Sequence, residues 1–407
     1  MLGDLRRSGF DIVEDHEESD AIIVNTCAFV DDAKSESLDT ILEAAEVCAE
    51  KSGKRLLVTG CLAQRYSGEL ADQLPEVDAF LGFERYGELP ETLRASLSSL
   101  PPPQGKAVST SGREHVLVGE ATVPFRPEWD RFQLTPSHSA YLRVAEGCNH
   151  ACTFCAIPGF RGKFRSKPQS SVMDEARVLV DRGVKELILI AEDTNQYGMD
   201  RCASPRCAAS ARAAPCLGGS VSCSPINRQT SVYISVRSSG DDAESSACRK
   251  ADQGLAELMR ELSKLEGLHW IRILYAYPSY FSEELIDEIA NNPKVVKYID
   301  MPLQHISNLT LLAMNRPPRD YTQALLEKLR ARIPDLALRT TFIAGFPGET
   351  EEQHRELVDF CRSFKFERMG AFVYSEEEGT PAHDFPSQVC DCRPLECLNC
   401  ARRSDWL

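Results

Sequence analysis

Three cysteines lie within eight residues of one another, Cys148, Cys152 and Cys155, in the stretch EGCNHACTFCAIPGFRG. Cysteine thiolates hold iron–sulfur clusters, and the spacing C-x3-C-x2-C lets one loop ligate three irons of a cubane 4Fe–4S cluster. With no fourth cysteine nearby, one iron keeps the open coordination position that distinguishes catalytic metal sites. The alternative is a structural zinc site, which usually pairs two C-x2-C units. The spacing therefore favours a catalytic iron–sulfur cluster.

Two more cysteines, Cys27 and Cys61, directly follow the short apolar runs 21–26 and 55–60. An amphipathic helical pattern over about 32–51 separates these runs. Strand, helix and strand in this order predict a parallel pair in an open α/β sheet. Ligands bind at the carboxyl ends of strands in such sheets, which is where both cysteines are expected.

The remaining cysteines call for separate explanations. The chain has 16 cysteines in 407 residues, and in a long chain this favours metal or redox chemistry over disulfides. Cys48 and Cys361 fall in helical patterns, where we expect small buried residues. Nine others lie in two segments without hydrophobic periodicity: Cys202, Cys207, Cys216, Cys223, Cys248, Cys390, Cys392, Cys397 and Cys400. The last four also have a spacing that could suit zinc, an alternative that stays open.

Strand-like runs alternate with helical patterns from residue 136 onward. Such repeats in one direction predict a partial (βα)6 barrel over 136–386, in which chemistry lies at the C-terminal ends of the strands. The cysteine loop, 147–165, follows the first run. The expected strands are 141–147, 186–192, 270–276, 295–302, 336–345 and 369–374.

Composition divides the rest of the chain. We expect an N-terminal open parallel α/β domain over 1–96 and a linker over 97–135, which begins rich in Pro, Ser and Gly. We expect 201–253 to be a disordered insert in the barrel and 387–407 to be a divergent, cysteine-rich tail.

Charge and hydropathy exclude some classes of protein. No run of about eighteen apolar residues is present, so we expect no membrane span. The formal net charge of −15 argues against a general nucleic-acid binder. The N-terminus shows neither a signal core nor a transit composition, which predicts a cytoplasmic protein. An organellar protein would need a transit segment upstream of Met1.

Six segments, in order, resemble the methylthiotransferases among the radical S-adenosylmethionine (SAM) enzymes. They extend over about 1–200 and 254–386, and are IIVNTCAFVDDAKSESLDTI, VTGCLAQRY, EGCNHACTFCAIPGFRGKFRSKP, DMPLQHIS, FIAGFPGET and YSEEEGTPA. DMPLQH, CLAQRY and YSEEEGTPA resemble the RimO-type branch, which modifies a small-subunit ribosomal protein, more than the branch that modifies tRNA. Family members continue into a small β-barrel (TRAM) domain, which we expect to be missing here because the chain departs from the pattern near residue 389.

The resemblance implies two 4Fe–4S clusters and SAM. Cys148, Cys152 and Cys155 would hold the radical cluster, whose open iron chelates SAM. Cys27 and Cys61 match two of the three ligands of a second cluster that supplies sulfur. The segment that carries the third ligand in the family is absent from this sequence, and its first strand with it.

The resemblance also implies contacts to SAM. Glu192 and Asp193 match the segment that holds the SAM amino group, and Gly345, Gly348 and Glu349 match a turn that contacts SAM. The plainer alternatives are a solvated strand end for the first and a simple strand-to-helix turn for the second. Catalytic residues beyond the cluster ligands stay unassigned.

From the resemblance we expect an enzyme that adds a methylthio group to the β-carbon of an aspartate in a small-subunit ribosomal protein, served by an electron donor protein. One alternative is a tRNA adenosine methylthiotransferase. Another is a remnant that cleaves SAM without sulfur transfer.

Two further features can be interpreted either as functional or as purely structural. A basic run surrounds the cysteine loop and would either bind SAM or substrate or form a solvated loop: Arg143, Arg161, Lys163, Arg165 and Lys167. His305 ends the fourth expected barrel strand, and a lone histidine there is more often structural than catalytic.

Overall fold

The computed structural model describes residues 1–50, 53–98, 115–120, 125, 133–201 and 254–388. The predicted insert 201–253, apart from Arg201, and all but the first two residues of the predicted tail 387–407 lie outside these ranges. So do the nine cysteines assigned to these two segments. Within the described ranges, no helix has both the length and the apolar character that a membrane crossing requires.

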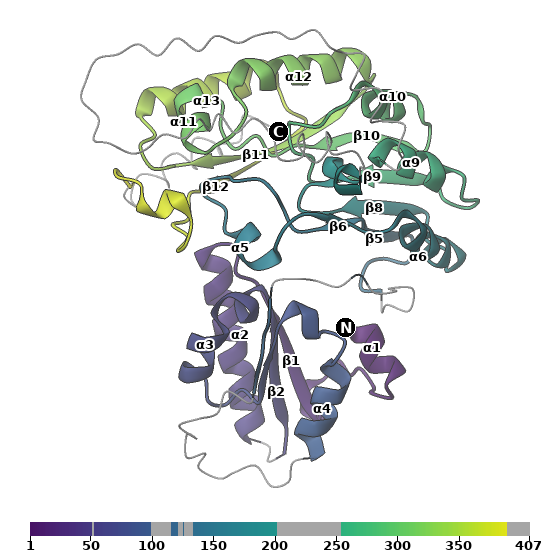
Figure 1. The fold of residues 1–407 in the computed structure, drawn as a ribbon, viewed down its shortest axis with the longest axis vertical. Helices are drawn as coiled ribbons and strands as arrows, with labels where there is room; N and C mark the ends of the chain where they lie inside the picture. The colour runs from purple at the N-terminus through teal and green to yellow at the C-terminus, as the bar shows by residue number, and fades with distance from the viewer. Residues whose placement is uncertain (51–52, 99–114, 121–124, 126–132, 202–253, 389–407) are drawn as a thin grey trace.

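The N-terminal part is an open parallel sheet with helices on both faces (Figure 1). Its strands pair in the order β1-β2-β3-β4, and β2 is buried along its whole length because it is central and covered on both sides. The elements are α1 (Leu2–Arg7), β1 (Ala21–Thr26), α2 (Asp31–Glu50), β2 (Arg55–Gly60), α3 (Cys61–Gln73), β3 (Ala79–Leu81), α4 (Leu89–Ser98) and β4 (Val116–Leu117).

Two apolar clusters hold this sheet. One packs Ile41 of α2 against Leu56 and Phe80, and the other packs Leu5 of α1 and Leu89 of α4 on the opposite face. Strand β4 lies inside the range predicted as a linker and pairs with β3, Phe80 opposite Val116. Its two residues are too few to give a periodic signal in the sequence.

The second part is a six-stranded parallel sheet in sequence order, β5 to β12, with its helices outside it (Figure 1). Its elements are β5 (Ser139–Arg143), α6 (Gln169–Asp181), β8 (Glu186–Ile190), α9 (Leu255–Ser263), β9 (Trp270–Ile273), α10 (Glu283–Asn291), β10 (Val295–Asp300), α11 (Asn308–Ala313), α12 (Arg319–Arg332), β11 (Ala337–Ala344), α13 (Glu351–Phe364) and β12 (Arg368–Val373). In the described residues β12 and β5 do not pair, so the predicted partial (βα)6 barrel is confirmed as an open one.

The barrel strands alternate in burial. In β11 every second side chain is buried, and these buried residues, such as Leu338 and Phe342, pack against α13 through Leu357 and Phe360. The other face lines the inside of the barrel and is half-buried. The inner face and the strand ends are thereby left free to carry chemistry.

Short elements complete the chain. A two-stranded antiparallel hairpin of β6 (Ala145–Glu146) and β7 (Arg165–Ser166) encloses α5 (Ile157–Arg161) after β5. Single 3-10 turns are η1 (His16–Glu18), η2 (Phe83–Arg85), η3 (Thr194–Gln196), η4 (Met199–Arg201) and η5 (Pro381–Asp384).

Candidate metal centre

The three clustered cysteines lie on the loop between β6 and α5, past the carboxyl end of β5. The backbone N–H of Cys148 donates to the carbonyl oxygen of Gly162 at 3.1 Å, and that of Cys155 donates to the carbonyl oxygen of Cys152 at 3.1 Å. Gly147 has φ 78°, and a Cβ there would overlap the carbonyl oxygens of Gly162 and Lys163. A glycine is therefore needed for the loop to cross the hairpin.

The thiols of this loop are partly buried and near one another. Burial, followed by the neighbouring Cys152, raises the pKa of Cys155 to about 12, and burial also raises the pKa of Cys148. Thiolates in this setting need a compensating cation, which a metal cluster provides. In the described part of the chain no three His, Cys, Asp or Glu side chains are grouped so as to hold a single metal ion. A cubane takes one thiolate on each of three irons, so three thiols on one loop would fit a cluster without converging on a single ion.

Contacts within the cysteine loop and from two other loops hold it in place. Arg316 donates from Nη1 to Sγ of Cys152 at 3.7 Å, and the backbone N–H of His150 donates to Sγ of Cys148 at 3.4 Å. The His150 ring stacks on Tyr277, with ring centroids 3.6 Å apart. Sequence reasoning missed these three residues: His150 lies in the cysteine motif but was not singled out there, and no motif or periodicity marks Arg316 or Tyr277.

Glu192, two residues after the end of β8, is half-buried, and its Oε2 is fully buried. Its Oε2 has no hydrogen-bond partner among the described residues, and its Oε1 lies 3.8 Å from Nη1 of Arg161. Burial and the charge of Glu146 raise the pKa of Glu192 to about 7, against the opposing effect of Arg161. An unpartnered buried acceptor beside Cys155 fits the amino group of SAM.

Asp193, next in the chain, is placed differently. It is fully buried, with Oδ2 2.6 Å from Nε2 of His150 and Oδ1 accepting from the backbone N–H of Tyr277 at 3.3 Å. Both oxygens are thus engaged by the protein. Asp193 fixes His150, while Glu192 alone of this predicted pair keeps an unpartnered oxygen.

The predicted turn Gly345–Glu349 is built around its glutamate. Oε2 of Glu349 accepts from the backbone N–H groups of Gly345 and Phe346 at 2.6 and 3.1 Å, and Oε1 lies 3.2 Å from both His305 Nε2 and His354 Nδ1. Burial alone would raise the pKa of Glu349, but these hydrogen bonds from His305 and His354 lower it to about 2. Its carboxylate therefore shapes the turn.

The two turn glycines and His305 take structural positions. Gly345 and Gly348 both have positive φ, 79° and 81°, which glycine adopts without strain. His305 is fully buried, and its Nδ1 accepts from the backbone N–H of Ser307 at 3.0 Å. Both of its ring nitrogens are engaged, in agreement with the structural interpretation.

Cys27 and Cys61 lie together at one edge of the N-terminal sheet. They follow Thr26 and Gly60, which are paired in the parallel register of β1 and β2. Gly60 has φ 100°, and a Cβ there would overlap the backbone of Thr26, so glycine allows the two strand ends to approach. Cys27 is exposed and Cys61 is half-buried. The pairing of β1 with β2 therefore places Cys27 and Cys61, which the sequence predicted to lie together, at neighbouring strand ends.

Arg161 connects the two groups of cysteines. It ends α5 in the barrel, and its Nη2 donates to Sγ of Cys61 at 3.6 Å. Its guanidinium also pairs with Glu146 at 3.1 Å and lies over the ring of Phe83 at 4.5 Å. The edge of the N-terminal sheet that carries Cys61 thus faces the cysteine loop of the barrel.

The other members of the basic run are divided among several partners. Arg143 pairs with Glu146, and Lys167 forms a fully buried pair with Glu175. Arg165 lies over the Phe125 ring at 5.5 Å, and Lys163 is exposed. Of the five residues in this run, only Arg161 forms a hydrogen bond to a cysteine within the described part of the chain.

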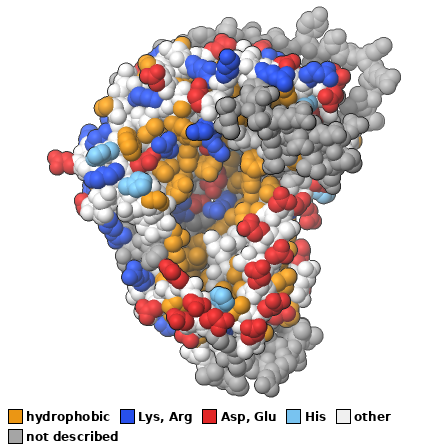
Figure 2. All heavy atoms as spheres, turned by 180° about the vertical axis from the view of Figure 1, so that it is seen from behind, with side chains coloured by type: hydrophobic (Ala, Val, Ile, Leu, Met, Phe, Trp, Pro, Cys, Tyr) orange, Lys and Arg blue, Asp and Glu red, His pale blue; other side chains and the backbone are white. Residues whose placement is uncertain are grey.

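A second contact joins the N-terminal domain to the barrel. Glu377 accepts hydrogen bonds at Oε2 from Arg65 at 2.8 Å and from Lys34 at 3.0 Å, although it is only 3% exposed. On a separate point, the surface of the molecule is hollowed near the middle of the face shown in Figure 2. Hydrophobic side chains line this hollow, and charged side chains lie at its floor.

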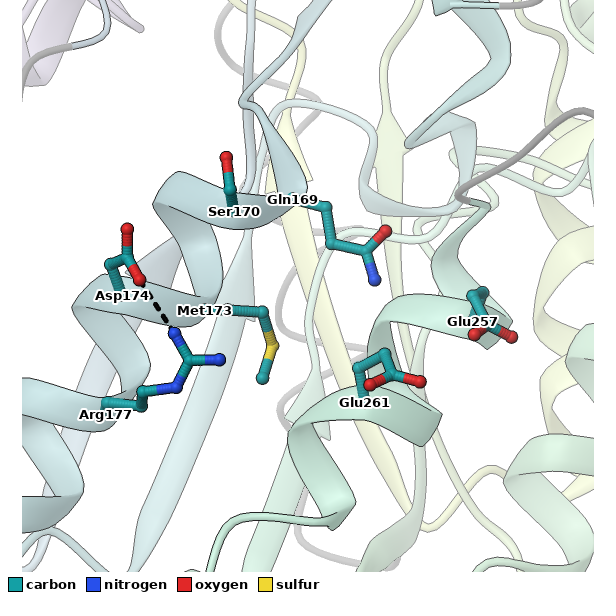
Figure 3. A pocket seen from close by; sticks show the side chains of 7 residues that line it. All are labelled: Gln169, Ser170, Met173, Asp174, Arg177, Glu257 and Glu261. Atoms are coloured by element: carbon teal, nitrogen blue, oxygen red, sulfur yellow. Dashed lines mark hydrogen bonds and ion pairs between the residues drawn. The ribbon is translucent and has the colours of Figure 1, made fainter.

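A polar pocket of about 340 Å³ lies elsewhere, on the outside of the barrel (Figure 3). It is formed by Gln169, Ser170, Met173, Asp174 and Arg177 of α6 with Glu257 and Glu261 of α9. None of the predicted site residues lines it.

Known proteins show the same division of the chain. Residues 142–361 match the radical SAM superfamily, and residues 1–82 match the uncharacterized protein family UPF0004. A solved structure of the radical SAM methyltransferase TsrM from Kitasatospora setae has a TM-score of 0.56 at 14% identity, over 94% of this chain and 73% of that one. This likeness supports the fold.

Relatives in sequence are closer. The ribosomal protein uS12 methylthiotransferases RimO of Akkermansia muciniphila and Desulforamulus reducens are each 40% identical to this chain, over 96% of it and over 77% and 74% of their own lengths. The protein of the same name from Geobacter sulfurreducens is also 40% identical, over 96% of this chain and 74% of its own. The chain therefore belongs to the RimO-type methylthiotransferases of the radical SAM superfamily.

Proposed function

We propose that this protein adds a methylthio group to the β-carbon of an aspartate in ribosomal protein uS12. The substrate protein is the one in the names of its relatives. The observation that carries the chemistry is the cysteine loop at the carboxyl end of the barrel, with the unpartnered Oε2 of Glu192 near it. An electron donor protein completes the system.

In this proposal Cys148, Cys152 and Cys155 hold a 4Fe–4S cluster, and Glu192 receives the amino group of SAM. When bound, the cluster and SAM supply the one-electron chemistry that removes a hydrogen atom from an unactivated carbon, which no side-chain base deprotonates. Asp193 and His150 keep the loop in place, and the Glu349 turn provides Gly345 and Gly348 as backbone contacts.

The edge with Cys27 and Cys61 would hold the second cluster, which supplies sulfur. Two protein thiolates are present at this edge, and Arg161 and Glu377 fasten it to the barrel. A chain that cleaves SAM without transferring sulfur is the second candidate, because the described residues place only Cys27 and Cys61 at this edge. Iron content separates the two: about eight irons per chain indicate both clusters, and about four only the radical cluster.

The test is anaerobic reconstitution followed by assay with SAM, a reductant and uS12. We expect 5′-deoxyadenosine and a uS12 peptide carrying a methylthio group on aspartate, identified by mass spectrometry. The triple variant Cys148→Ala, Cys152→Ala and Cys155→Ala should lose both products, while Cys48→Ala, on the N-terminal helix α2, should keep them. Unmodified uS12 alongside modified tRNA would contradict the proposed substrate, and SAM cleavage by the triple variant would contradict the cluster.

A further inference from the structure

Arg316 brings a positive charge to the cysteine loop from a distant segment, after α11. Besides its contact with Sγ of Cys152 at 3.7 Å, its Nη2 donates to the carbonyl oxygen of Pro302. Its Nε is buried and has no hydrogen-bond partner in the described part of the structure. The side chain is anchored at two points with its charge against Sγ.

Arg316 is half-buried, and the charge of Asp193 acts on it only from beyond ion-pair distance. Across the described residues no carboxylate forms an ion pair with it, whereas its neighbour Arg319 pairs with Glu356. Buried charges are normally paired, because an isolated one is costly. What Arg316 does contact directly is a cysteine sulfur, so its charge is placed to stabilise negative charge at the cysteine loop.

A stack of side chains holds the guanidinium there. Its central carbon lies 4.1 Å from the centroid of the Tyr277 ring, and His150 stacks on Tyr277 with an interplanar angle of 13°. Asp193 holds the His150 ring through Nε2, which lies 2.6 Å from Oδ2 of Asp193. These four residues come from four separate loops, so the position of the charge is fixed by the barrel as a whole.

We propose that Arg316 is a positioning residue that raises the reduction potential of the cluster held by Cys148, Cys152 and Cys155. This inference rests on the proposed function, since it needs the cluster. A cluster bound by three thiolates becomes more negative on reduction, and a fixed, weakly solvated cation stabilises that state. Hydrogen bonds to the sulfurs act in the same direction.

The experiment uses the full chain with Cys27→Ala and Cys61→Ala, so that only one cluster contributes to the signal. Arg316→Met and Arg316→Lys are made in this background and reconstituted anaerobically. SAM is left out, so no acceptor takes an electron from the cluster. The cluster itself accepts one electron from redox mediators whose potential is set with dithionite. Iron content and the EPR signal of the reduced cluster are followed as the potential is varied.

We expect unchanged iron in Arg316→Met, and a ratio of reduced to oxidised cluster that falls about tenfold at the parent midpoint, equivalent to about 59 mV. Arg316→Lys should recover most of the shift, because it keeps the charge. Arg319→Met, which removes a neighbouring arginine paired with Glu356, should leave the potential unchanged.

An unchanged potential in Arg316→Met with full iron content would overturn the inference. Should that variant hold no iron, Arg316→Gln takes its place, with the same expectation. Failure of both neutral variants to hold iron would also overturn it, because Arg316 would then serve cluster assembly. A parent chain that takes up no cluster would instead refute the proposed function, before any Arg316 variant is compared.

Discussion

The guanidinium of Arg161 donates a hydrogen bond to the sulfur of Cys61, with Nη2 and Sγ 3.6 Å apart. One residue belongs to the barrel and the other begins α3 of the N-terminal domain. Arg161 also lies close to Glu192, the carboxylate beside the radical site. A single side chain thus links the place where SAM would bind to the place from which sulfur would come.

Replacing Arg161 should impair methylthio transfer more than it impairs SAM cleavage. Arg161→Met loses the donor to Cys61 and the pairing with Glu146, and we expect methylthio transfer to fall about tenfold or more, as for other groups that support a metal ligand. SAM cleavage should fall far less, because Cys148, Cys152 and Cys155 are untouched. The ratio of modified uS12 to 5′-deoxyadenosine measures this. Arg177→Met, which removes an outer arginine paired with Asp174, is the control, and an equal loss of both products would contradict the prediction.

The buried carboxyl of Glu192 should make stability depend on pH. Its pKa is raised to about 7 in the folded chain, from 4.5, by burial and by Glu146, while Arg161 opposes this. Between these values the folded state binds more protons than the unfolded state, so stability falls as pH rises. Glu192→Gln removes this loss, and above pH 7 it should stabilise the SAM-free chain by up to about 3 kcal/mol.

Thermal unfolding of the metal-free protein from about pH 5 to pH 8 tests this. The gain from Glu192→Gln should appear only as pH rises through the window, and exposed Glu266→Gln should show none. The same variant should bind SAM more weakly in the reconstituted enzyme, since it loses the negative charge. A gain that does not change with pH would show that Glu192 is not the titrating group.

Sequence patterns located the strand ends but not the contacts between them. Cys27 and Cys61 were predicted to meet because each follows an apolar run, and the register of Thr26 with Gly60 confirms it. Arg316 could not be found this way, because it lies 164 residues from Cys152 and meets it only through the packing of the barrel.

Glu192 and Asp193 show a second reason why contacts at the site could not be predicted from the sequence. Both were expected to hold SAM because they match one segment, yet Asp193 has both oxygens engaged by His150 and Tyr277, while Glu192 keeps an oxygen unpartnered. Neighbours in a chain leave a strand end in different directions, and the loops that receive them decide which stays available. Glu349 is similar, since His305 and His354 reach it from separate elements.

The contact of Glu377 with Lys34 and Arg65 should govern how the two domains unfold. Glu377→Gln leaves two partly buried cations without their shared carboxylate, which should cost about 3 kcal/mol, the lower end for a broken buried pair because both cations keep other partners. We expect calorimetry to show the N-terminal domain melting earlier than the barrel. Glu378→Gln, at the adjacent exposed position, should change little, and a single unshifted transition in Glu377→Gln would contradict this role.

Gly147 should be irreplaceable in the cysteine loop. An alanine there would need φ 78°, which costs about 1–2 kcal/mol, and its Cβ would overlap the carbonyl oxygens of Gly162 and Lys163. The hairpin would have to move, and with it the hydrogen bond that holds Cys148 to Gly162. Gly147→Ala should therefore lose cluster iron as well as stability. Gly159→Ala is the matched control, because this glycine is in α5 with open space around it, and alanine should stabilise the helix by up to about 1 kcal/mol. If both variants kept full iron, the loop geometry would not depend on the left-handed turn at Gly147.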